Sequence, residues 1–242
     1  MESSWKPLYR AGAWAAIAVL VLVPFQIAVF ILWPLPETVE AWFALFETNT
    51  FAALADLDVL MIVDNVLLAV LFLAVCVALR RSHPSWLAIG AMFEGMAIVT
   101  YLSSNTALEM LTLSGRYAAS SSGEERAILL AAGEAMVATW TGSAFTTAYV
   151  LSAVAILILS GVMLRSRVFG RPTAWVGLVF GALSIVPASA GTPGLVFSLL
   201  SLIPMWLWLG LLARRLLQLA STKQEAAPFQ ERPLLRFARE PA

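Results

Sequence analysis

Apolar residues form six long runs along this chain, and short polar or proline-containing breaks separate most of them. A helix needs about 20 mostly apolar residues to cross the hydrocarbon layer of a membrane. The pattern therefore predicts an all-α fold, a polytopic bundle of six transmembrane helices. The predicted spans are Ala11 to Trp33, Leu57 to Leu79, Trp86 to Ser104, Thr139 to Leu164, Ala174 to Ala190 and Leu195 to Ala213.

A shorter amphipathic segment follows the first run. Within Glu37 to Phe46, the apolar residues Val39, Trp42, Phe43 and Phe46 repeat at helical spacing, and glutamates lie on the other side. This pattern is typical of a helix lying on a membrane surface. The alternative is a loop whose aromatic side chains pack on the bundle.

A helical hairpin is predicted between the third and fourth spans. Ser121 and Ser122 each precede a glutamate by three residues, which makes two overlapping capping boxes. A helix should therefore begin near Ser122 and continue into the fourth span. An unbroken third helix from Ser85 to Ala118 would be about 50 Å long, against a membrane of about 30 Å, so the hairpin should project outward.

The basic residues give the orientation. Cytoplasmic loops of membrane proteins are rich in Lys and Arg. With the amino terminus inside, 13 of the 15 basic residues are cytoplasmic, and only Arg116 and Arg126 lie outside. The chain is therefore predicted to be a multi-pass protein of the cell membrane with both termini cytoplasmic. Residues 1–220 form one transmembrane domain, and the polar, proline-containing stretch 221–242 is expected to be a flexible cytoplasmic tail.

Composition supports a membrane protein and narrows the function. The chain is 60% hydrophobic and only 12% charged, where soluble domains carry about a quarter charged residues. The net charge is zero, so no basic surface for nucleic acid is expected. The single Cys76 cannot form an internal disulfide, and the single His83 argues against multi-histidine metal sites. The expected partner is the lipid bilayer, and the oligomeric state is left open.

Ionisable groups inside a membrane are costly, so Asp64 and Glu94 stand out. Glu94 lies near mid-depth of the third span and starts a stripe at helical spacing that continues through Tyr101, Asn105, Glu109, Thr112 and Arg116. Such a stripe should face protein or water, not lipid. Asp56 and Asp58, by contrast, are expected at the membrane interface, solvated by water and capping the second span.

Two interpretations of Glu94 are open. The functional one is a polar cavity open to the outside that binds a cation, a proton or a small polar ligand. Its predicted ligand-binding residues are Glu94, Asp64, Asn65, Tyr101, Asn105 and Tyr149. The structural one is a protonated Glu94 that hydrogen-bonds to a neighbouring helix.

The sequence gives little support for a catalytic function. No span contains a lysine for a retinal Schiff base, His83 lies in a predicted cytoplasmic turn, and no nucleotide-binding glycine pattern is present. Gly177 and Gly181 form a GxxxG, which in an apolar helix is a packing motif. No cofactor, metal site or catalytic residue is predicted.

Several short motifs resemble a bacterial family of integral membrane proteins known as domain of unknown function 4386. They include Leu57 to Met61 with Val63 to Asn65, then Ser104 to Leu111, Ala131 to Ala135, Gly142 to Phe145 and Met163 to Arg171. The likeness covers roughly Ala11 to Leu219. It implies the membrane architecture, supplies no activity, and draws attention to Asp58, Asp64, Asn105, Glu109 and Glu134.

Three functional hypotheses follow. The first is a protein that handles an ion or small ligand in the outward polar cavity. The second is a membrane scaffold or sensor that acts through the outer helical hairpin. The third, ranked last, is a carboxylate-based membrane enzyme. Convergence of Glu94, Asp64 and Tyr149 on one void would favour the first or third hypothesis, and a closed bundle would favour the second.

Overall fold

The structure, a computed structural model, describes residues 3–221, and over this range it contains only helices. The predicted tail therefore lies outside the described residues except for Ser221. The elements are η1 (Ser3–Trp5), α1 (Lys6–Leu32), α2 (Val39–Thr48), α3 (Thr50–Asp56), α4 (Val59–Leu79), α5 (Pro84–Ser104), α6 (Ala107–Ala119), α7 (Gly123–Trp140), α8 (Ser143–Arg165), α9 (Arg171–Leu183) and α10 (Gly191–Ser221).

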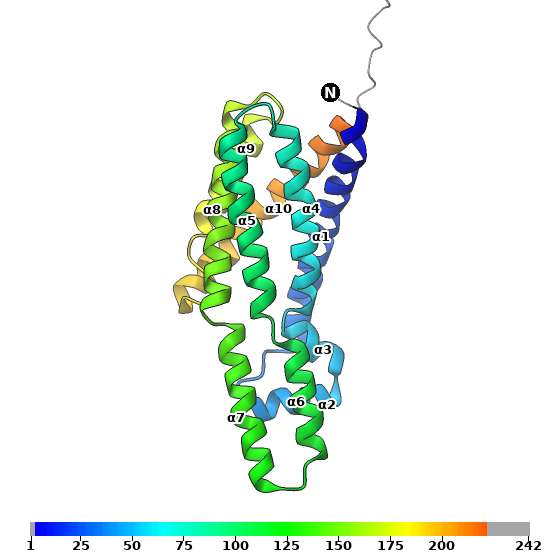
Figure 1. Ribbon diagram of the computed structural model, residues 1–242, viewed down its shortest axis with the longest axis vertical. Helices are drawn as coiled ribbons and strands as arrows, with labels where there is room; N and C mark the ends of the chain where they lie inside the picture. Colours follow the sequence, from blue (N-terminus) through cyan, green and yellow to red (C-terminus); the bar gives the residue numbers. More distant parts are fainter. Residues whose placement is uncertain (1–2, 222–242) are drawn as a thin grey trace, which may run out of the picture.

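Six of these helices form a closed ring. Each contacts its two neighbours in the order α1, α4, α5, α8, α9, α10 and back to α1. Both ends of the described chain lie at one end of this bundle, together with the α4–α5 connection (Figure 1). We call this the terminal end. The short helices α2 and α3 lie with α6 and α7 at the opposite end, and we call these four helices the end assembly.

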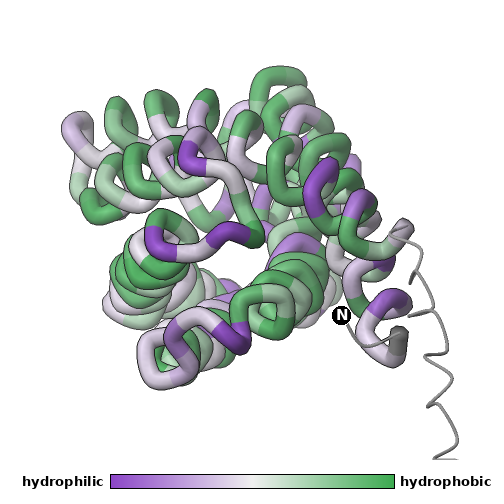
Figure 2. Tube along the Cα trace, turned by 90° about the horizontal axis from the view of Figure 1, so that it is seen from above, coloured by the Kyte–Doolittle hydropathy of each residue, from purple (hydrophilic) through white to green (hydrophobic). Residues whose placement is uncertain are grey.

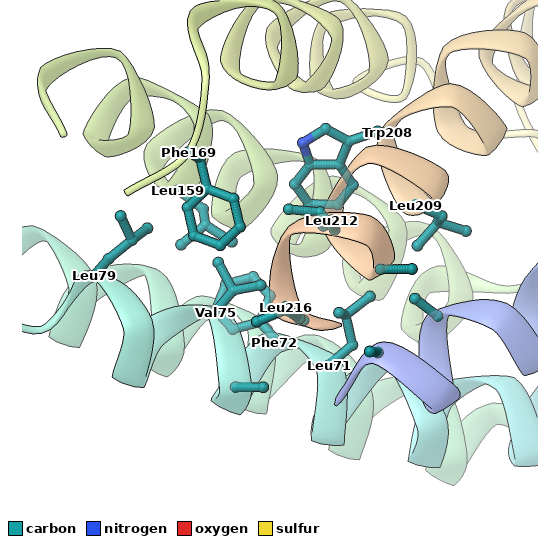
Figure 3. Close-up of a cluster of buried hydrophobic side chains, with 14 of the residues drawn as sticks. Leu71, Phe72, Val75, Leu79, Leu159, Phe169, Trp208, Leu209, Leu212 and Leu216 are labelled. Carbon is teal, nitrogen blue, oxygen red and sulfur yellow. The ribbon is translucent and has the colours of Figure 1, made fainter. Parts of the chain in front are cut away.

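A hydrophobic core fills the ring between the helices. Figure 3 shows side chains of α4 facing side chains of α10, with Leu159 of α8 and Phe169 completing the cluster. The labelled residues of these two helices are Leu71, Phe72, Val75, Leu79, Trp208, Leu209, Leu212 and Leu216. Close helix packing accompanies this core. A Cβ atom on Gly177 would overlap side chains of α8 and α10, and one on Gly181 would crowd Leu157, which confirms the predicted packing role of the GxxxG.

Five helical segments are long and apolar enough to cross a membrane: Lys6–Leu32, Val59–Leu79, Pro84–Ala119, Gly123–Arg165 and Gly191–Ser221. The third and fourth each comprise two helices joined across a short break. The predicted fifth span, Ala174 to Ala190, is not confirmed, because α9 has 13 residues and ends at Leu183. At 1.5 Å per residue that helix is only about 20 Å long.

The outer surface of the bundle is apolar. Side chains such as Val21 and Ile31 of α1 and Val99 of α5 are each more than two-thirds exposed. Seen along the bundle from the terminal end, hydrophobic residues line the helices and hydrophilic residues gather near their ends (Figure 2). Apolar surface of this extent needs lipid around it, so the chain has the build of a multi-pass membrane protein.

The amphipathic segment after α1 is helical, as predicted, but its apolar face packs on protein. Thr38 caps α2 by accepting a hydrogen bond from the backbone of Ala41 at 3.2 Å. Trp42 and Phe43 are buried against α6 and α7, and Phe43 stacks on Tyr117 at 5.2 Å between ring centroids. The expectation of aromatic residues lying in the membrane surface is therefore wrong, because α6 and α7 cover that face.

The segment between the third and fourth spans forms two helices that pack on each other. Ser122 accepts a hydrogen bond from the backbone of Glu125 at 3.4 Å, which confirms the predicted start of a helix there. Neither helix is continuous with its span, however. Breaks at residues 105–106 and 141–142 separate α5 from α6 and α7 from α8. The stripe from Glu94 to Arg116 is consequently divided between two helices.

Candidate functional site

Three breaks in the helices meet where the end assembly joins the bundle. The Asn105 side chain, between α5 and α6, donates a hydrogen bond to the carbonyl oxygen of Leu57, between α3 and α4, at 2.8 Å. Thr106 donates to the carbonyl oxygen of Met136 in α7 at 3.2 Å. The Trp140 indole, at the end of α7, donates to Asp58 at 2.7 Å. We call the group Asp56, Asp58, Tyr101, Asn105 and Trp140 the junction.

Asp58 has an unusual backbone at the centre of the junction. Its φ of 62° places it in the left-handed region, which the other described non-glycine residues do not occupy. Aspartate tolerates this region better than most residues because its short side chain can bond locally. Its side chain makes no cap bond to α4, although it occupies the N-cap position, and instead accepts the bond from Trp140. The expected capping role is therefore wrong.

Asp56 is completely buried, with 0% of its surface exposed. Within residues 3–221, neither of its carboxyl oxygens has a hydrogen-bond partner. The expectation of a water-solvated Asp56 is also wrong, because α3 turns this residue into the protein. Burial, and then the neighbouring charge of Asp58, raise the pKa of Asp56 to about 6. Burial likewise raises the pKa of Asp58 to about 6, although the bond from Trp140 offsets part of the effect.

Tyr101 connects the junction to the membrane-spanning part of α4. Its hydroxyl interacts with the carboxyl group of Asp58, toward which it can donate a hydrogen bond, and it lies within electrostatic range of Asp64. Asp64 is buried in α4 and accepts a hydrogen bond from the Gln26 amide of α1 at 2.7 Å. The second carboxyl oxygen of Asp64 has no partner in the described chain. Of the predicted binding residues, the structure thus brings Asp64 and Tyr101 near one another.

Glu94 belongs to a separate contact. It is buried, and Ser152 of α8 donates a hydrogen bond to its carboxyl group at 3.0 Å. This is the interhelical bond of the structural interpretation, with Ser152 as the partner in place of Tyr149 or Asp64. Cys76 of α4 also interacts electrostatically with Glu94. The prediction that the Glu94 face meets protein is confirmed.

The remaining predicted residues do not converge on Glu94. Asn65 donates to the Met61 carbonyl of its own helix at 2.8 Å. Tyr149 donates to Ser198 of α10 at 3.2 Å and stacks on Phe145, which in turn stacks on Tyr101. One groove along α1 and α10 and another along α5 and α8 are lined by other residues. Glu94, Asp64 and Tyr149 therefore each contact a different partner, Ser152, Gln26 and Ser198 respectively, where the sequence predicted one shared cavity.

Sequence reasoning missed Asp56, Asp58 and Trp140 as members of a site. No short-range signal joins them, because Asp58 and Trp140 are 82 positions apart. The sequence marks Gln26 as a polar residue within an apolar run, but it does not indicate that Asp64 is its partner. Within the described residues, no three His, Cys, Asp or Glu side chains come close enough to hold a metal ion. The junction can instead bind and release protons.

The two asparagines offer a matched test of the junction. Asn105→Ala removes both the bond to Leu57 and the bond that Asn105 accepts from the backbone of Ala107 at 3.2 Å. We expect a loss of about 1 to 2 kcal/mol in the free energy of unfolding, because a buried carbonyl loses its donor. Asn65→Ala, which removes a bond within one helix, should cost less than half as much. Thermal unfolding in detergent measures both, and equal losses would contradict the bridging role of Asn105.

Comparison with known proteins adds no relative: no family model, curated protein or solved structure matches this chain. The resemblance to domain of unknown function 4386 stays a prediction.

Proposed function

We propose that this protein is a membrane sensor that registers protons at the junction and responds through the end assembly. The observation that carries the proposal is Asp56, a fully buried carboxyl group without a hydrogen-bond partner in the described chain, beside a second carboxyl group at Asp58. A buried carboxyl group without partners favours its neutral, protonated form. Proton loss there creates a charge that the surroundings do not stabilise.

Because Asp56 and Asp58 lie where α3 ends and α4 begins, a change in their charge can move the end assembly relative to the bundle. Asp58 lies between α3 and α4, and its partner Trp140 lies where α7 ends. When both carboxyl groups are charged they repel one another, and each gains from contact with water. The backbone on either side of Asp58 belongs to separate helices, so the end assembly can tilt without breaking a helix. Tyr101 of α5 also faces Asp58, and Tyr101 in turn lies within electrostatic range of Asp64 in α4.

The orientation of the sensor follows from charge. Arg80 lies over the Trp5 ring at 5.1 Å, and Arg10 and Arg214 line one groove, so basic residues from distant parts of the chain gather at the terminal end. By the positive-inside rule, this end is cytoplasmic. The end assembly then lies outside the cell membrane, with α6 and α7 as the projecting hairpin. Protons are accordingly sensed on the outer side.

The same orientation supports six crossings. Lys6 begins α1 and Ser221 ends α10 at the same end of the bundle (Figure 1). Two ends on one side require an even number of crossings, and five segments are long enough to span alone. We assign the sixth crossing to α9 together with residues 184–190, which return the chain to the start of α10.

Spin labels can test the proposed movement. With Cys76→Ala as background, labels at Ser121→Cys in the α6–α7 loop and Val66→Cys on the exposed face of α4 report the distance between end assembly and bundle. We expect this distance to change between pH 5 and pH 7.5. Asp56→Asn should hold the pH 5 distance at both values because asparagine stays neutral.

The control is Glu109→Gln, which removes an exposed carboxylate from the same assembly and should preserve the response. A wild-type distance that ignores pH, or a full response in Asp56→Asn, would contradict the proposal.

Ion handling is the second candidate function. It is favoured by the unpartnered Asp64 carboxyl oxygen and the Tyr101 hydroxyl, which lie within electrostatic range of each other. The same labelled protein can be titrated with sodium or potassium ions at constant pH. A distance change caused by these ions in the wild type, and absent in Asp64→Asn, would favour cation binding over proton sensing.

A further inference from the structure

A groove of about 700 Å³ runs between α1 and α10 at the terminal end, away from the junction. Arg10, Trp14, Ile17 and Leu20 line one wall, in steps of four, three and three residues that keep them on one helix face. From Arg10 to Leu20 this wall is about 15 Å long, close to half of a hydrocarbon layer. The groove therefore extends along α1 over about the thickness of one membrane leaflet.

Polarity changes along the groove. Arg10 and Arg214 are exposed near its mouth, and no residue in the range 3–221 forms an ion pair or hydrogen bond with either guanidinium group. Deeper along α1 the lining becomes purely apolar with Ile17 and Leu20. Trp14 lies between the two zones and is 63% exposed, as suits an indole at the boundary of headgroups and acyl chains.

We infer that this groove binds one anionic phospholipid of the inner leaflet. The guanidinium groups of Arg10 and Arg214 face the phosphate, with which arginine forms paired charge-assisted hydrogen bonds. One acyl chain lies along Trp14, Ile17 and Leu20. Basic grooves between transmembrane helices on the cytoplasmic side are suited to such headgroups, and a zwitterionic lipid would gain less from two positive charges.

Gly210 explains why an acyl chain fits. A Cβ atom added there meets no atom within 4 Å, so the α10 wall is open at this position. Gly210→Leu should fill the groove without disturbing the protein. Gly95 of α5 has the same open surroundings outside the groove, which makes Gly95→Leu a matched control.

The test measures lipid retention by native mass spectrometry of the full chain, with phosphatidylglycerol or phosphatidylcholine added at equal concentration. We expect one phosphatidylglycerol to be retained in preference to phosphatidylcholine. In Arg10→Gln/Arg214→Gln that affinity should fall at least roughly tenfold. Gly210→Leu should reduce it similarly although both arginines remain.

Two variants control for general effects. Arg167→Gln/Arg171→Gln removes the same charge from exposed positions that do not line the groove, and it should retain phosphatidylglycerol like the wild type, as should Gly95→Leu. Equal retention of the two lipids by the wild type, or unchanged retention in the Arg10/Arg214 variant, would overturn the inference. Lipid binding that appears only after removal of residues 222–242 would also overturn the inference, since it would mean that this segment, and not a lipid, occupies the groove.

Discussion

Lowering the pH from 7.5 to 5 should raise the free energy of unfolding of this protein by about 1.4 kcal/mol through Asp56 alone. The pKa of Asp56 is about 6 in the folded protein and about 3.8 when it is free of its surroundings. Between these values the folded state holds the proton and the unfolded state does not, so stability falls as the pH rises from about 4 to about 6. One pKa unit corresponds to about 1.4 kcal/mol, and pH 5 lies about one unit below the pKa of Asp56 in the folded protein, which gives the stated size.

Asp56→Asn provides the decisive comparison for this pH dependence. The variant should be more stable than the wild type at pH 7.5, and its stability should change much less across the same range. Asp58 has a similarly raised pKa, so part of the dependence should remain. Unfolding followed by tryptophan fluorescence at several pH values measures both proteins. A wild type that becomes less stable on acidification would show that Asp56 is hydrated in the folded state.

Gly177→Leu should cost about 3 kcal/mol or more in stability, or prevent folding in the membrane. A Cβ atom at this position of α9 would overlap the Ser160 hydroxyl of α8 and the Trp208 indole of α10. Because three helices meet there, the added side chain must push at least one of them outward, and overpacking a core typically costs 1 to 3 kcal/mol even for smaller changes. For a chain of this size each kcal/mol lowers the melting temperature by roughly 2 to 4 °C.

Gly95→Leu is the matched substitution, since it makes the same chemical change where the added atoms meet no neighbour. It should leave the melting temperature in detergent nearly unchanged, or raise it slightly because leucine favours helix over glycine. Equal melting temperatures for Gly177→Leu and Gly95→Leu would mean that α9 does not pack against α8 and α10 as the structure has it.

The membrane-spanning helices could be predicted because apolar length decides them. The observed α4, Val59–Leu79, begins two residues after the predicted start and ends at the same residue. The end of α9 could not be predicted in this way, because Ile185 and Val186 continue the apolar run after the helix has stopped at Leu183. Hydropathy measures how readily a segment dissolves in lipid, and it does not report the residue at which the hydrogen bonding of a helix ends.

The site was harder to predict because it depends on contacts between distant residues. Glu94 and Asp64 attracted notice as charges in apolar runs, yet each found a partner on a different helix, Ser152 and Gln26 respectively. Asp56 carried the opposite signal, since an acidic residue at a helix end normally meets water. Its burial arises from the turn at Asp58 and the packing of the end assembly, and no local sequence pattern encodes either.

The packing of α2 also constrains how the chain is made. Trp42 and Phe43 are covered by α6 and α7, which are encoded far downstream. The roughly 90 residues from the end of α2 to the end of α7 take about 5 to 20 seconds to synthesise at ordinary rates of translation. Until then the aromatic face of α2 is only partly covered by protein. During biogenesis there is therefore an interval in which the exposed apolar face of α2 can associate with other proteins, because the helices that bury it have not yet been fully synthesised.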